Sequence, residues 1–225
     1  MSAQNGVATI PGAGPGDETI IINAHADAWF DGAGDNGDGL AVLVALARHF
    51  AGGAYEPRRT LVFVASAGHH SPGLNGPRNL VAMNPVIARH AVLALNIEHV
   101  AQRNLSPARS LSADGYREFV ADAGEAPIVA GVSNASPFLD DLFRQGVERY
   151  GTNFVSGPST MASGEGGGYR SLGVAIVTVM QAPPLYHTSG EVIEVISTPG
   201  LERIARFLAF FIKQVDQAPR SLINP

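Results

Sequence analysis

The 225-residue sequence contains no cysteine, only one tryptophan and few charged residues, which make up 16% of the chain. Without cysteine there is neither a disulfide framework nor a thiolate metal site, so any metal must be bound by histidine, aspartate or glutamate. The formal net charge is −5 and no run of lysine and arginine is present, so we expect no nucleic-acid partner. No apolar stretch approaches the ~20 residues that cross a membrane, so we expect no membrane partner either. With 45% hydrophobic residues, the chain has the composition and length of a globular protein with one core.

Apolar runs separated by glycine and proline predict an α/β fold. Continuous apolar segments typical of buried strands occur at 18–26, 58–67, 90–99 and 173–180. Segments with the helical pattern occur at 37–50, 74–84, 134–151 and 201–215. This alternation predicts three layers, with a mostly parallel (mixed) central sheet and helices on both faces. Residues 101–172 are less regular, and we expect them to form a long excursion with one strand–helix unit.

We expect residues 1–225 to form a single domain. The first residues, MSAQNGVATIPG, lack the basic and then apolar pattern of a signal peptide. This start is compatible with a mature form that carries an added Met and with a fragment of a longer protein that lacks N-terminal elements.

Side chains that bind metals cluster directly after the predicted strands. Sheets of this kind bind ligands beyond the carboxyl ends of their strands. The residues concerned are His25 and Asp27 after the first strand, Asp35 in GAGDNGDG, His69 and His70 after the second, Glu98 and His99 at the end of the third, and His187 in PPLYHTSGE. Imidazole and carboxylate ligands without sulfur suit Zn²⁺. Two such ions bridged by one carboxylate would form a hydrolytic centre.

Four stretches carry a resemblance to a known family. They are INAHADAWFDGAGDNGDGLAVLVALAR, PRRTLVFVASAGHHSPGLNG, LALNIEHV and VAIVTVMQAPPLYHTSGEVIE, in this order over most of residues 18–195. The sequence resembles the co-catalytic zinc aminopeptidases of the zinc exopeptidase fold, whose relatives include bacterial leucyl aminopeptidase, glutamate carboxypeptidase II and the transferrin receptor. The resemblance implies a metal-dependent hydrolase that cleaves an amide bond in peptides or small amidated substrates, with two Zn²⁺ per chain. It also implies secretion or a periplasmic location.

The resemblance implies a role for each matching residue. The implied metal ligands are His25, Asp35, His70, Glu98 and His187, with Asp35 bridging both ions. Asp27 matches the aspartate that orients the first histidine, and the peptide bond before Asn36 matches one that is typically cis. We expect Asn36, Tyr186 and Glu165 to lie at the substrate.

The chain departs from the family at two functional positions. His69-His70 stands where the family usually has Glu-Glu, the first as general base and the second as metal ligand. An imidazole can take a proton near neutral pH, so His69 is the candidate base. Ser163-Gly164-Glu165 stands where the family often has Ser-Asp-His, and Glu165 is a candidate to compensate.

Two neighbouring residues at the end of the third predicted strand, Glu98 and His99, are alternative metal ligands. Glu98 matches the family's usual aspartate and is one methylene longer. His99 could replace it, but neighbouring strand residues face opposite sides, so we do not expect Glu98 and His99 both to bind.

Two other functions are compatible with these residues. A family fold that has lost catalysis could serve in binding, as the transferrin receptor does, and the missing Glu-Glu pair favours this. A mononuclear amidohydrolase with one zinc ion is the other. The sequence does not indicate the oligomeric state.

Overall fold

A computed structural model of the protein describes residues 2–111, 113, 115, 117–156 and 164–225. Within these residues, seven strands form one mixed sheet in the order β1-β3-β2-β4-β9-β7-β8. They are β1 (Gly6–Ile10), β2 (Thr19–His25), β3 (Thr60–Ser66), β4 (Ala91–Glu98), β7 (Ile128–Val132), β8 (Phe154–Ser156) and β9 (Ala175–Met180). Strands β3, β2, β4 and β9 are parallel, whereas β1 and β7 run antiparallel to β3 and β9. The predicted α/β fold with a mostly parallel, mixed sheet is confirmed.

The central strands are apolar along their length because both faces of the sheet are covered. In β2, Ile20 and Ile22 belong to the core on one face, and Ile21 between them belongs to the core on the other. Alternate residues of a strand point to opposite faces, so one continuous apolar run serves two cores.

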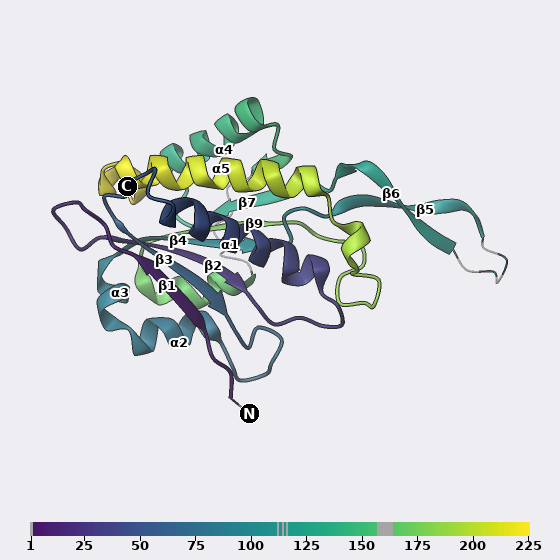
Figure 1. The fold of residues 1–225 in the computed structure, drawn as a ribbon, viewed down its shortest axis with the longest axis horizontal. Coiled ribbons are helices and arrows are strands. Elements are labelled where there is room, and N and C mark those ends of the chain that lie inside the picture. The colour runs from purple at the N-terminus through teal and green to yellow at the C-terminus, as the bar shows by residue number, and fades with distance from the viewer. Residues whose placement is uncertain (1, 112, 114, 116, 157–163) are drawn as a thin grey trace.

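Helices form the outer two layers, as Figure 1 shows. One face is covered by α1 (Asp38–Ala51), α4 (Pro137–Tyr150), α5 (Thr198–Gln217) and the short α6 (Arg220–Ile223). The other face carries α2 (Gly76–Met83), α3 (Pro85–His90) and a 3₁₀ segment, Gly164–Leu172. Helix α5 begins after Ser197, whose hydroxyl accepts a hydrogen bond from the Gly200 N–H at 3.1 Å. Its buried side packs Phe207 and Phe211 into the core.

A two-stranded hairpin of β5 (Arg103–Leu111) and β6 (Arg117–Glu125) extends away from the main sheet (Figure 1). With β7, α4 and β8 it fills the region where we expected an excursion with one strand–helix unit. Strands β1 and β8, helix α3 and the hairpin were not predicted from the sequence. In the part of the chain that the structure describes, no helix is both long and apolar enough to span a membrane.

Candidate active site

Four neighbouring parallel strands end at one edge of the sheet, where their loops bring histidines around one aspartate. His25 is the last residue of β2, His69 and His70 follow β3, His99 follows β4, His187 lies in the segment after β9, and Asp35 lies in the turn before α1. The structure thus brings together the predicted His25, Asp35, His69, His70 and His187, and adds His99.

The Asp35 carboxylate lies at the centre of this cluster. Its Oδ1 is 3.0 Å from His25 Nε2 and 2.8 Å from His99 Nε2. Its Oδ2 is 3.3 Å from His70 Nε2 and 2.9 Å from His187 Nε2. Burial raises the pKa of Asp35, but the imidazoles of His25 and His99 outweigh burial and hold that pKa far below its ordinary value. Asp35 is therefore ionised, and each of its two oxygens faces a different pair of imidazoles.

The cluster fits a metal. Two sets of side chains that include Asp35, one with His25 and His99 and one with His70 and His187, have ligand atoms within 4.8 Å of one another. The Nε2 atoms of His25 and His70 and the Oδ2 atom of Asp35 are buried without a hydrogen-bond partner. Buried polar atoms without partners are costly, and a cation among these atoms would satisfy all of them.

Asp27 supports the cluster in two ways. Its main-chain carbonyl lies 3.0 Å from His25 Nδ1, whereas its carboxylate is 3.8 Å from that atom. The carboxylate instead accepts hydrogen bonds from the main-chain N–H groups of His69 (3.2 Å) and His70 (2.9 Å). The predicted orientation of His25 by Asp27 is thus made mainly by the backbone, and the side chain fixes the turn that carries both later histidines.

Glu98 lies beside the cluster rather than within it. Its Oε1 accepts hydrogen bonds from Asn96 Nδ2 (2.8 Å) and from the Glu165 N–H (2.7 Å), and the residue is 1% exposed. His99 Nε2 reaches Asp35 instead. The ligand role that we predicted for Glu98 is not supported by this position. Glu98 and His99 do not both join the cluster, as we expected, and His99 follows the end of β4 with φ 50°, in the left-handed region.

Asn36 holds the end of β4. The Asp35–Asn36 peptide bond is cis, as the resemblance implies. The Asn36 side chain donates to the Ile97 carbonyl (2.9 Å) and accepts from the His99 N–H (3.1 Å), and the residue is 2% exposed. Because both ends of its amide are bonded to the backbone, the predicted substrate contact of Asn36 has no support here.

Glu165 is buried next to His69. Its Oε1 lies 3.6 Å from His69 Nδ1, and its Oε2 accepts hydrogen bonds from Ser66 Oγ and Asn23 Nδ2. Burial lowers the pKa of His69, but Glu165 and Glu98 outweigh burial and raise it. At 1% exposure Glu165 has no surface open to a bulky substrate, so its predicted substrate contact has no support here. Its neighbour Ser163 lies outside the described residues.

Two acidic residues that the sequence analysis missed hold the loops of the site. The Asp38 Oδ2 atom accepts from the N–H groups of Val100 (2.9 Å) and Ala101 (2.8 Å), directly after His99. Burial raises the pKa of Asp38 to about 7. Glu191 Oε2 accepts from the His187 N–H at 3.1 Å. The short H-T-S-G-E spacing after His187 was the available signal for Glu191.

Two cavities flank the cluster. One of about 650 Å³ is walled by Trp29, Phe30, Leu74, His69, His70 and His187, among others. The second, of about 300 Å³, is lined by His99, Gln181 and Tyr186, among others. The Tyr186 ring stacks on His187 with centroids 3.6 Å apart, so this predicted substrate residue lies at the rim of the site.

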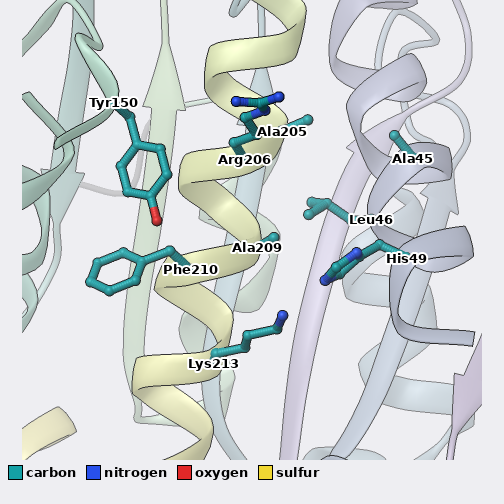
Figure 2. A pocket seen from close by; sticks show the side chains of 9 residues that line it. All are labelled: Ala45, Leu46, His49, Tyr150, Ala205, Arg206, Ala209, Phe210 and Lys213. Atoms are coloured by element: carbon teal, nitrogen blue, oxygen red, sulfur yellow. The ribbon is translucent and has the colours of Figure 1, made fainter. Parts of the chain in front are cut away.

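A further cavity lies away from these residues. It has a volume of about 410 Å³ and runs between α1 and α5, with His49 and Lys213 on its two sides and Tyr150 at one end (Figure 2). No residue of the histidine cluster lines it.

Comparison with known proteins identifies a matching family and solved structures of similar fold. The sequence profile described as "Peptidase family M28" matches residues 5–212. Among solved structures, the fold is similar to an aminopeptidase from Aneurinibacillus sp. strain AM-1, with a TM-score of 0.75 and 19% identity, covering 98% of this chain and 50% of that one. BSAP, a zinc aminopeptidase from Bacillus subtilis, has a TM-score of 0.73 and 17% identity, and the match covers 98% of this chain and 53% of that one. The LapA aminopeptidase from Legionella pneumophila has a TM-score of 0.73 and 15% identity, and the match covers 95% of this chain and 56% of that one. The chain thus spans about half the length of these proteins.

Proposed function

Since the chain belongs to peptidase family M28, we propose that it is a metal-dependent hydrolase of the aminopeptidase type, acting on amide bonds of peptides or small amidated substrates. The observation that carries this proposal is the Asp35 carboxylate, which offers one oxygen to each of two groups of imidazoles. A bridging carboxylate of this kind is typical of two-metal hydrolytic centres.

We propose that the centre holds zinc, with two ions per chain, on His25, Asp35, His70 and His187. The unpartnered buried atoms of His25, His70 and Asp35 support this assignment. Bound zinc would supply a Lewis acid for the amide carbonyl and lower the pKa of a bound water.

His69 is the proposed site of proton transfer, in place of the family's glutamate. The Glu165 carboxylate, 3.6 Å from His69 Nδ1, keeps a proton on that nitrogen. The Nε2 atom of the ring is then free to take a proton from water and to pass it to the leaving amine. Stacking of the His69 ring on His25, with centroids 4.4 Å apart, fixes its position against the cluster.

The walls of the larger cavity favour an apolar side chain on the substrate. Trp29 and Phe30 are both exposed at its edge, and Leu74 lies on its lining. The Trp29 ring is 5.9 Å from the His70 ring, measured between centroids, so an apolar group held there lies next to the metal ligands.

The second candidate function is binding without catalysis. The observation that favours it is His69-His70 in place of Glu-Glu, because an imidazole has a shorter reach than a glutamate arm. A mononuclear amidohydrolase, with one zinc ion, is the third.

Hydrolysis of aminoacyl anilides by zinc-loaded protein tests the proposal. We expect turnover of a leucyl anilide, loss of turnover with a chelator and recovery with zinc. Asp35→Ala should bind no zinc and show no turnover, whereas the control His49→Ala should match the unaltered protein. Full activity of Asp35→Ala would contradict the mechanism, and zinc binding without turnover of any peptide or amide would favour the binding function.

A further inference from the structure

We propose that His99, and not Glu98, completes the second metal site with His25 and Asp35, so that four imidazoles surround one bridging carboxylate. This inference rests on the proposed function, because it concerns the same centre. It changes the ligand set that the family resemblance implies, in which a carboxylate follows the third strand.

The hydrogen bonds of two rings carry the inference. The Nδ1 atom of His25 faces the Asp27 carbonyl at 3.0 Å, and the Nδ1 atom of His99 faces the Gln181 carbonyl at 3.4 Å. A carbonyl oxygen only accepts hydrogen bonds, so a ring proton on Nδ1 would satisfy each carbonyl and leave the Nε2 atom of each ring able to bind a cation.

Both Nε2 atoms lie next to the same oxygen. Asp35 Oδ1 lies 3.0 Å from His25 Nε2 and 2.8 Å from His99 Nε2. The three side chains have ligand atoms within 4.8 Å of one another, and the buried His25 Nε2 atom has no hydrogen-bond partner that a cation would have to replace. Metal-bound histidines typically donate their other ring N–H to a carbonyl or carboxylate, which is the arrangement of both rings here.

Backbone hydrogen bonds hold His99 in its position beside Asp35. His99 follows the last residue of β4 and has a φ of 50°, in the left-handed region. Asn36 accepts from the His99 N–H, and Asp38 accepts from the next two N–H groups. A left-handed conformation at a residue other than glycine persists only where its surroundings hold it.

Glu98 is engaged elsewhere. The two hydrogen bonds at its Oε1 atom, from Asn96 and from the Glu165 backbone, tie β4 to the start of the 3₁₀ segment. Among the groups of ligand atoms found within the described residues, none includes Glu98. Its role is to hold Glu165 in place behind His69.

Zinc stoichiometry of paired variants tests this inference. Four proteins are each dialysed with zinc, then against metal-free buffer, and analysed for zinc per chain. They are the unaltered protein, His99→Ala, Glu98→Gln and the control His49→Ala. We expect two ions in the unaltered protein, in Glu98→Gln and in His49→Ala, and one ion in His99→Ala.

The two possible failures are distinguishable. Loss of one ion in Glu98→Gln together with two ions in His99→Ala would overturn the assignment of His99 and leave the proposed function standing. Absence of zinc from the unaltered protein would overturn the proposed function itself. If His99→Ala fails to fold by circular dichroism, the Glu98→Gln result still decides, because one ion in that folded variant contradicts the inference.

Discussion

Glu165 Oε1 lies 3.6 Å from Nδ1 of His69, and no hydrogen-bond partner for this oxygen is found elsewhere among the described residues. The pair combines an imidazole that faces the cavity with a carboxylate that is buried behind it. In the proposed mechanism, this pair holds and moves the proton in place of the family's glutamate.

Glu165→Gln should lower kcat about 10- to 100-fold, because the amide keeps the shape of the side chain and removes the charge that holds the His69 proton. KM and zinc content should stay unchanged, since Glu165 is not a proposed ligand. Steady-state kinetics with parallel zinc analysis checks this. The exposed Glu194→Gln serves as control, and an unchanged kcat in Glu165→Gln would remove the pair from the mechanism.

Glu191→Ala should weaken zinc binding about 10- to 100-fold, because residues that orient a metal ligand typically contribute this much to metal affinity. The Glu191 carboxylate accepts from the His187 N–H and so fixes the loop that carries this ligand. Titration with a competing chelator measures the affinity. Glu194→Ala, three residues further on and exposed, should bind zinc as the unaltered protein does.

Arg203→Ala should destabilise the protein at neutral pH and lose this effect in acid. Glu125, at the end of the hairpin, pairs with Arg203 and accepts from Ser197 at the start of α5. Burial raises the pKa of Glu125, but Ser197 and Arg203 outweigh it and lower the pKa below 4.5. A lowered folded-state pKa means that the stabilisation is present above the unfolded-state value and is lost as pH falls through the folded-state value.

Thermal unfolding at several pH values measures this effect. At pH 7 we expect a Tm lower by about 2–4 °C, which corresponds to about 1 kcal/mol in a chain of this size. The difference should close as the pH falls through the lowered folded-state pKa of Glu125, where the carboxylate becomes protonated. The exposed pair of Arg206 with Glu202 gives the control, since Arg206→Ala should change Tm little at any pH. A difference that persists in acid would show that Arg203 acts through packing and not through charge.

The sequence predicted those parts of the fold that repeat a simple pattern. The strands β2, β3, β4 and β9 are long apolar runs, and α1, α4 and α5 have apolar residues at helical spacing, so all were found with small shifts of their ends. Strand β1 has mostly exposed residues, and β8 has three residues, so neither carries a strong pattern. In the part of the chain that the structure describes, β5 and β6 form a separate two-stranded sheet, so they lack the long apolar run of a central strand.

The position of a site residue could be predicted where it lies at the end of a strand. It could not be predicted where a single backbone angle decides which residue reaches the site. His25, His69 and His70 lie at or directly after strand ends, and their convergence follows from the parallel sheet. The choice between Glu98 and His99 depends on the left-handed conformation of His99, which strand alternation does not anticipate. The burial of Asn36 depends likewise on hydrogen bonds to the distant end of β4.

The zinc content of the unaltered protein and of Asp35→Ala tests the central claim most directly. Asp35 contacts all four proposed imidazole ligands, so its removal should abolish the centre. Elemental analysis after dialysis with zinc and then without it should give about two ions per chain for the protein and none for Asp35→Ala. Equal zinc content in the two, or none in either, would contradict the proposal that Asp35 bridges a hydrolytic metal centre.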